Sequence, residues 1–184
     1  MGWGYDFPFY LVQIAPFEGY GNDNVNGAII RDQQRMVSEH VFNTGMVVVS
    51  DIGNLKDIHP RNKIDVGKRL ANLALSKTYG LQGLSFSGPT FKDYEFVNED
   101  LVINFDFAEG GLKFKGKLSD HLELLKDGRW SSVSALVKGS TIVIDKVLVK
   151  DAEALRFAYK NDSTPGLFNQ DGLPASCFKF EINK

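Results

Sequence analysis

The sequence predicts a fold of the class α/β plus all-β. Before about residue 82, short apolar runs alternate with segments of helical periodicity, which is the pattern of a parallel sheet. After that point the hydrophobic period changes to two, as in antiparallel strands with one buried face. We therefore expect two domains, an α/β domain at residues 1–82 and an antiparallel β-sandwich at residues 83–184.

Two strands and two helices account for the first domain. Residues 9–15 (FYLVQIA) form an apolar run that Pro16 ends, and residues 46–49 (MVVV) form a second run typical of a strand covered on both faces. Segments 28–42 and 66–79 carry apolar residues at helical spacing. The order strand, helix, strand, helix predicts parallel pairing of the two strands.

The second domain is predicted from alternation and turn residues. Turns are expected at Gly110-Gly111, Asp127-Gly128 and Lys138-Gly139-Ser140. The alternating apolar positions are Leu101, Ile103, Phe105 and Phe107, then Leu112 and Phe114, then Ile142 and Ile144, then Leu155, Phe157 and Tyr159, then Phe178, Phe180 and Ile182.

The α/β domain is too small to be a complete doubly wound sheet. Two strands cannot bury apolar faces on both sides, and such sheets normally have about five strands. We therefore expect a further segment N-terminal to Met1. An unpaired strand edge in the chain as it stands favours self-association.

Composition excludes several classes of partner. The 184 residues are 43% hydrophobic and 24% charged, with a formal net charge of -2, so no basic field favours nucleic acid or an anionic membrane. The single cysteine, Cys177, excludes an internal disulfide and a cysteine-based metal cluster. No apolar run approaches the length of a membrane span, and MGWGYDFPFY does not have the pattern of a signal peptide.

The segment 57–63, DIHPRNK, contains the strongest catalytic candidate, His59. It follows the second predicted strand, and sites in open α/β sheets form beyond the carboxyl ends of the strands. An imidazole there can accept a proton from a serine hydroxyl near neutral pH, and a carboxylate on its other nitrogen would orient it. Asp57 can reach His59 if the loop is extended, and Pro60 restricts the backbone of His59. The structural alternative is a polar surface loop in which Asn62 or Pro60 caps the following helix.

A nucleophile is not evident. Gly83-Leu84-Ser85-Phe86-Ser87 nearly matches the G-x-S-x-G elbow, but it ends in serine and follows a helix, so we interpret it as linker. Ser50, beside Asp51, is interpreted as a strand-end hydroxyl.

Other polar and aromatic residues have plainer interpretations. His40 and His121 lack metal-ligating partners at useful spacing. Asn161-Asp162-Ser163 fits the glycosylation sequon, but that pattern is a weak signal, and Trp130 is more typical of core packing than of a sugar-stacking platform.

The chain resembles sialate O-acetylesterases, members of the SGNH (GDSL-like) esterase superfamily. The resemblance covers nearly the whole chain. It is carried by DFPFYLVQIAPF, by Arg31 to Gln34, by GMVVVSDIGNLKDIHPRNKIDVGKRLANLALSKTYG, and by GRWSSVSALVKGSTIVID, LRFAYKND and LFNQDGLPAS toward the C-terminus.

The resemblance implies a flavodoxin-like domain, here as its last two βα units, followed by the β-sandwich. It implies removal of acetyl groups from sugars, typically sialic acids, by a serine nucleophile without metal or cofactor. The family's catalytic histidine matches His59, whereas its serine lies in an early Gly-x-Ser block that this chain lacks. The superfamily usually spaces acid and histidine as Asp-x-x-His, so the orienting acid is open between Asp57, Asp51 and a backbone carbonyl. Export to the periplasm or outside the cell is typical of the family.

Overall fold

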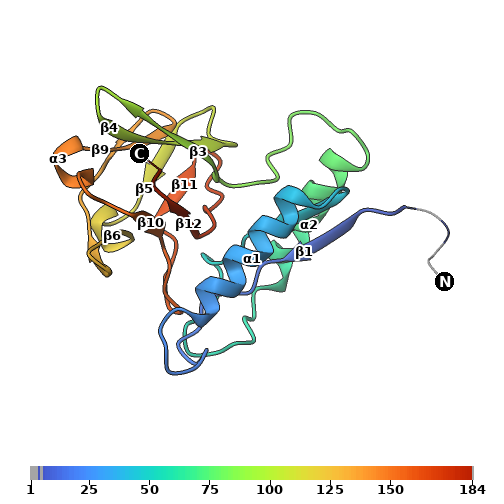
Figure 1. The fold of residues 1–184 in the computed structure, drawn as a ribbon. Helices are drawn as coiled ribbons and strands as arrows, with labels where there is room; N and C mark the ends of the chain where they lie inside the picture. Colours follow the sequence, from blue (N-terminus) through green and yellow to red (C-terminus); the bar gives the residue numbers. More distant parts are fainter. Residues whose placement is uncertain (1–3, 5, 184) are drawn as a thin grey trace.

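The fold is described from a computed structural model, which covers residue 4 and residues 6–183. Met1 to Trp3 and Tyr5, which belong to the N-terminal segment without a signal-peptide pattern, lie outside the described residues. The chain forms an α/β half followed by a half that contains several antiparallel sheets (Figure 1). The mixed class predicted from the sequence is therefore observed.

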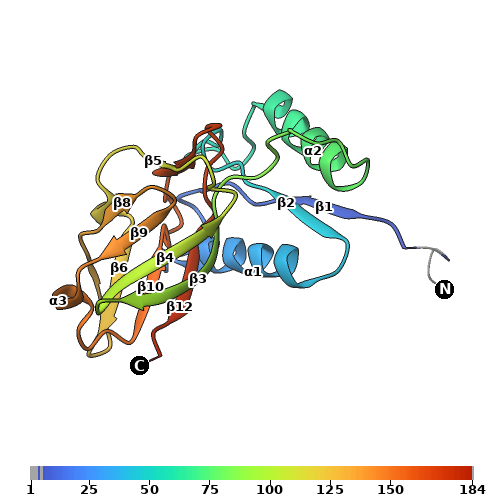
Figure 2. The same ribbon diagram turned by 90° about the horizontal axis from the view of Figure 1, so that it is seen from above.

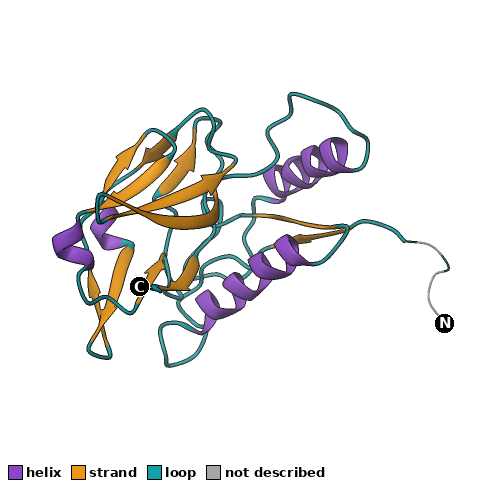
Figure 3. Cartoon of the chain, turned by 45° about the horizontal axis from the view of Figure 1, so that its top comes forward, coloured by secondary structure: helices purple, strands orange, loops and turns teal. Residues whose placement is uncertain are grey.

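The α/β half consists of β1 (Phe9–Val12), α1 (Asn26–His40), β2 (Thr44–Val47) and α2 (Lys63–Lys77). β1 and β2 pair in parallel, from Phe9↔Thr44 to Val12↔Val47, which confirms the predicted pairing. The two helices lie on opposite sides of this pair (Figures 2 and 3).

The second strand lies two residues earlier than the predicted run at residues 46–49. Beyond Val47 the Val48 carbonyl accepts a hydrogen bond from Arg69 Nη1 at 2.6 Å instead of continuing the ladder. The first strand is also shorter than predicted and ends at Val12. A buried apolar cluster of Val47, Val49 and Leu73 holds α2 against the sheet.

The β half contains two four-stranded antiparallel sheets, in the orders β3-β4-β9-β8 and β12-β10-β6-β7, and a two-stranded pair of β11 with β5. Buried residues of both larger sheets, among them Ile103, Ile142, Leu124 and Phe157, belong to one hydrophobic cluster. The bounds are β3 Thr90–Val97, β4 Asp100–Asp106, β5 Leu112–Phe114, η1 Leu118–Asp120, β6 Leu122–Lys126, β7 Arg129–Ser132, β8 Leu136–Lys138, β9 Thr141–Ile144, α3 Lys146–Val149, β10 Ala154–Phe157, β11 Leu167–Asn169 and β12 Phe178–Glu181.

Buried hydrogen bonds join the two halves. Gln13 Nε2 donates to Ser176 Oγ at 2.7 Å, and Arg31 Nη2 donates to the Lys160 carbonyl at 2.6 Å. Asn161 contributes most: its Oδ1 accepts from the Gly27 N–H at 2.7 Å, within the first turn of α1. No side chain of the local sequence caps this helix, so Asn161 supplies the missing acceptor from a distant part of the chain.

The same contacts show whether Asn161 can be glycosylated in the folded chain. The residue is 1% exposed, and its Nδ2 donates to the Asp23 carbonyl at 3.2 Å. A side-chain nitrogen buried and bonded in this way is not an acceptor for a glycan in the folded chain. Asn161 is therefore part of the junction between the halves.

Candidate active site

The loop from β2 to α2 carries the candidate residues, and its own short polar side chains shape it. Asn54 Oδ1 accepts from the Lys56 N–H at 3.0 Å, and Asp57 Oδ1 accepts from the His59 N–H at 2.9 Å. Both bonds join a side chain to the backbone two residues on, which is how Asn and Asp stabilise turns. The loop is therefore folded by local sequence, at the carboxyl end of β2.

His59 and Asp57 are brought together, but not through the ring. His59 Nδ1 lies 3.8 Å from Asp57 Oδ1, beyond hydrogen-bond distance, while the backbone N–H of His59 holds the same oxygen. The His59 side chain is 88% exposed. An imidazole presented in this way can exchange protons with a partner that approaches it, and catalytic hydrogen bonds commonly tighten when a substrate binds.

Asp51, the alternative acid, is engaged elsewhere. Its two oxygens accept from Arg69 Nη1 and Nη2, each at 2.6 Å, and both side chains are largely buried. Arg69 lies on α2 and also bonds the Val48 carbonyl, so the pair fixes the end of β2 to α2. The sequence alone does not single out Arg69. In the sequence, the one feature that distinguishes Arg69 is its place in the run VGKRLA, one turn into the predicted helix.

The start of α2 supports the structural alternative as well. Asn62 is the N-cap, and its Oδ1 accepts from the Asp65 N–H at 3.1 Å. Asn62 Nδ2 donates to Asp65 Oδ2 at 2.8 Å, and this bond, with a second from Lys68, lowers the pKa of Asp65. The predicted capping by Asn62 is thus confirmed. It coexists with the exposed histidine three residues earlier.

An apolar groove lies beside His59. It has a volume of about 510 Å³ and is lined by Ile58 and Pro60, the two neighbours of His59, together with Ile14, Ile30 and Val66 among others. Its walls come from the end of β1, from α1 and from the start of α2. The edge of β1 that faces away from β2 has no strand partner among the described residues. The candidate histidine therefore stands next to an uncovered strand edge.

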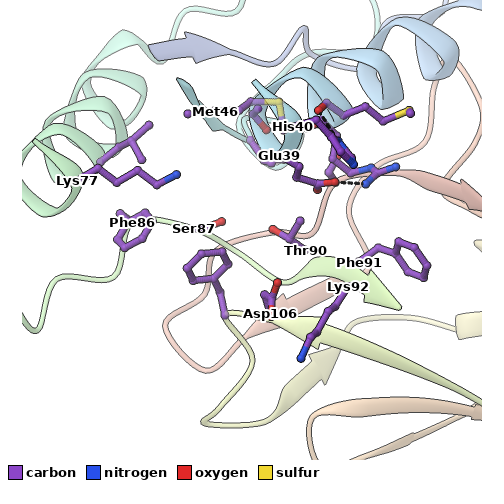
Figure 4. A pocket seen from close by; sticks show the side chains of 18 residues that line it. Glu39, His40, Met46, Lys77, Phe86, Ser87, Thr90, Phe91, Lys92 and Asp106 are labelled. Atoms are coloured by element: carbon purple, nitrogen blue, oxygen red, sulfur yellow. Dashed lines mark hydrogen bonds and ion pairs between the residues drawn. The ribbon is translucent and has the colours of Figure 1, made fainter. Parts of the chain in front are cut away.

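A second cleft, also of about 510 Å³, lies between the two halves (Figure 4). Glu39, His40, Lys77, Lys92 and Asp106 are among its lining residues, and none of the candidate residues of the β2–α2 loop lines it. His40 Nδ1 lies 2.9 Å from the Met36 carbonyl, and Ser87 Oγ donates to the Gly88 carbonyl at 3.0 Å. These two side chains bond backbone carbonyls, so they do not form a nucleophile and base pair.

Other candidates from the sequence are placed as follows. Ser85 lies in the loop between α2 and β3, as the linker interpretation expects. Trp130 is half-buried, and the Arg156 guanidinium lies 4.3 Å from its ring centroid, so the ring is not an open stacking surface. His121 is packed near Phe114 and Phe157 rather than among metal-ligating residues.

Neither a metal cluster nor a membrane segment is found in the part of the chain that the structure describes. No group of three or more His, Cys, Asp or Glu side chains there could hold a metal ion. None of the helices there is both long and apolar enough to cross a membrane. Cys177 is buried, its Sγ lies 3.5 Å from the Ala28 carbonyl, and burial raises the pKa of the thiol to about 11.

Comparison with solved structures relates the chain to an esterase. No protein-family model and no curated protein matches the sequence. The chain is similar to a crystal structure described as a novel carbohydrate acetylesterase from Xanthomonas citri, with 32% sequence identity and a TM-score of 0.81. The match covers 96% of this chain but 41% of that one. The likeness thus extends over both halves, and the chain spans less than half the length of the protein that it resembles.

Proposed function

We propose that the chain is the histidine-bearing C-terminal portion of a carbohydrate O-acetylesterase, which hydrolyses acetyl esters on sugars of the sialic acid type by a serine and histidine mechanism. The similarity to a carbohydrate acetylesterase over 96% of the chain carries this proposal. The exposed His59 at the carboxyl end of a parallel strand supports it, because that is where α/β sheets place their sites.

In the proposed mechanism, a serine hydroxyl outside these 184 residues attacks the acetyl carbonyl. His59 accepts the hydroxyl proton and then donates it to the departing sugar oxygen, which leaves an acetyl-enzyme. Water, deprotonated by His59, then attacks the acetyl carbonyl; the bond to the serine oxygen breaks, acetate leaves, and His59 returns the proton to that oxygen. Asp57 is our first choice as the orienting acid. In the structure Asp51 already bonds Arg69 through both oxygens, which favours a structural role for Asp51.

The groove beside His59 supports the view that more of the enzyme packs here. Ile30 and Ile58 line it and are 48% and 45% exposed, and the neighbouring edge of β1 is unpaired among the described residues. Exposed apolar surface around a bare strand edge is expected to be covered in a complete protein. We propose that the missing cover is the serine-bearing part of a flavodoxin-like SGNH domain, of which residues 1–82 are the last two βα units.

The finer features of the β half belong to the same proposal. We propose that residues 83–184 are an antiparallel β-sandwich accessory domain, supported by the hydrophobic cluster that its two larger sheets share. We also propose that the full enzyme is exported to the periplasm or beyond the cell.

The test is acetate release from O-acetylated N-acetylneuraminic acid and from a small acetyl ester. We expect release only from a protein extended N-terminally through a Gly-x-Ser segment, and none from the 184-residue chain. In the active form, His59→Ala should lower turnover by at least about 100-fold, because general base catalysis is lost. The matched control is His40→Ala, which removes an exposed histidine on α1 and should leave turnover unchanged. Release by the short chain, or full turnover without His59, would contradict the proposal.

A non-catalytic sugar-binding module at residues 83–184 is the rival function. It requires that the β half act by itself and independently of His59. The buried bonds from Gln13, Arg31 and Gly27 to the β half count against such independence, as does the covered ring of Trp130.

A further inference from the structure

A pocket of about 380 Å³ lies where the β2–α2 loop meets the β half. We call it the junction pocket. On one side it is lined by Pro16, Ser50 and Asp51, and on the other by Lys115, Thr164 and Pro165. Ser50 and Asp51 lie three and four residues after the end of β2, in the β2–α2 loop, so the pocket adjoins the loop that carries His59. It is separate in its lining from the apolar groove, which contains the neighbours of His59.

The two walls of the junction pocket are fixed to each other. The Phe17 N–H, next to Pro16, donates to the Asn161 carbonyl at 2.9 Å, and Asn161 precedes the wall residues Thr164 and Pro165. Within the α/β wall, the Glu18 N–H donates to the carbonyl of Leu55, a further wall residue, at 2.9 Å. A pocket whose walls are held by backbone hydrogen bonds is preformed and loses little conformational entropy when a ligand enters.

The lining combines apolar and polar surface. Pro16 and Pro165 offer apolar faces, Thr164 offers a hydroxyl, and Ser50 Oγ is a buried hydroxyl without a hydrogen-bond partner among residues 4 and 6–183. A buried hydroxyl in a pocket wall that has no protein partner is available to a ligand that brings a hydrogen-bonding group. A pyranose ring has the matching chemistry, because its C–H faces are apolar and its rim carries hydroxyls.

One charge in the lining is left uncompensated. The Asp51 carboxylate is neutralised by Arg69. Lys115 is exposed, and in the described part of the chain no carboxylate lies within ion-pair distance of it. Its Nζ lies 4.6 Å from the ring centroid of Phe168, which also lines the pocket, so the ammonium is held over this wall. The pocket therefore favours an anionic group on its ligand.

We propose that the junction pocket is a sugar subsite for a ring that carries a carboxylate, a hexuronate-type unit adjoining the acetylated sugar, with Lys115 as the residue that selects the carboxylate. The part of this inference that places the bound ring beside an acetylated substrate sugar rests on the proposed function. The binding of a carboxylate-bearing sugar to the pocket is tested by binding alone, without turnover. The β half then contributes to substrate choice and does more than support α1.

The experiment is an NMR titration of the ¹⁵N-labelled chain with methyl β-D-glucuronide and, separately, methyl β-D-glucopyranoside. We expect amide shifts around Asp51, Lys115 and Gly172 with both sugars, and about fivefold tighter binding of the glucuronide, the contribution of one exposed ion pair. Lys115→Gln should remove that preference and leave the glucoside affinity unchanged. The matched control is Lys117→Gln, which removes an exposed lysine two residues away that does not line the pocket.

Two further variants and one salt complete the test. Thr164→Trp, at an exposed wall position, should fill the pocket and abolish binding of both sugars while the spectrum stays that of a folded chain. Ser50→Ala should weaken both sugars alike, because its hydroxyl meets a ring hydroxyl rather than the charge. Sodium acetate at the same concentration should not reproduce the shifts.

The proposal is overturned if neither sugar shifts these amides, if the wild type binds both sugars equally, or if Lys117→Gln acts like Lys115→Gln. Acetate release by the extended enzyme without any shift at the junction pocket would reject this subsite and keep the esterase. Sugar binding here without acetate release by the extended enzyme would keep the subsite and reject the esterase.

Discussion

Arg69 holds Asp51 through both ends of its guanidinium, with Nη1–Oδ1 and Nη2–Oδ2 distances of 2.6 Å each. The two side chains are 13% and 17% exposed. The pair links the end of β2 to α2 directly beside the loop that carries His59. The two acids of this loop therefore have different structural roles. Asp51 fixes the sheet to the helix, whereas Asp57 accepts a hydrogen bond from the backbone N–H of His59 and so shapes the loop there.

Removing the Asp51 charge should therefore cost stability. Asp51→Asn leaves the Arg69 charge largely buried without its partner, and we expect the free energy of unfolding to fall by about 2 kcal/mol. Urea unfolding followed by circular dichroism measures it. The control is Asp57→Asn, whose side chain is 44% exposed and whose Oδ1 can still accept from His59; it should change stability by less than about 0.5 kcal/mol. Equal losses in the two variants would refute the division of roles.

Asn161 should contribute more to the free energy of unfolding than a residue in a loop usually does. Asn161→Ala deprives the buried Gly27 N–H, in the first turn of α1, of its side-chain acceptor, and it removes the Asn161 Nδ2 bond to the Asp23 carbonyl. We expect a loss of about 2 to 3 kcal/mol in the free energy of unfolding. Hydrogen exchange should also accelerate at Gly27.

The neighbouring variant Asp162→Ala removes an exposed side chain and is the control, with an expected change within about 0.5 kcal/mol. If Asn161→Ala were as mild as Asp162→Ala, α1 would not depend on a cap from the β half.

The sequence predicts the elements near the site well where their signals are local. The Asn62 cap and the helix after it follow from neighbouring residues, whereas the second strand ends two residues before the predicted run does. The position of the loop with His59 can therefore be predicted from the sequence, although the exact end of the strand cannot. Within the loop, the spacing predicts that Asp57 reaches His59 from two residues away. It does so through the backbone N–H rather than the ring, which spacing alone cannot distinguish.

The contacts that join the two halves cannot be predicted from local sequence. Asn161 and Gly27 are 134 residues apart, and neither local sequence indicates which residue the other will contact.

The strand β3 is not predicted from the sequence either, because a bulge between Phe91 and Asp93 breaks the alternation. Phe91 and Tyr94 both pack on the core although they are three residues apart, so the period of two does not appear in this strand.

The isolated chain should self-associate through the groove at the β1 edge. Ile30 is 48% exposed there, next to a strand edge without a partner among the described residues. We expect the sedimentation coefficient to rise with concentration, and Ile30→Lys to shift the chain toward the monomer. The control is Val147→Lys on α3 of the β half, also at an exposed position, which should sediment as wild type. A monomer at all concentrations would count against this prediction.

His121 should make the fold sensitive to mild acid. Its ring lies between Phe114 and Phe157, with centroid distances of 5.5 and 6.1 Å, and its Nδ1 is buried without a partner among the described residues. Burial lowers the pKa of His121, with a smaller contribution from Lys160 and an opposing one from Asp120. Protonation therefore occurs more readily in the unfolded chain, where a histidine titrates at about pH 6.5.

The sign of the effect follows from proton counting. Between the folded pKa and about pH 6.5 the unfolded state binds more protons, so the free energy of unfolding falls as the pH falls through this window. His121→Leu removes the titrating ring and keeps an apolar side chain between the two phenylalanines. We expect the variant to gain stability relative to wild type on going from about pH 7.5 to about pH 5.5, measured by urea unfolding at both values. A stability difference that is the same at both pH values would contradict the prediction, because it would mean that folding leaves the pKa of His121 unchanged.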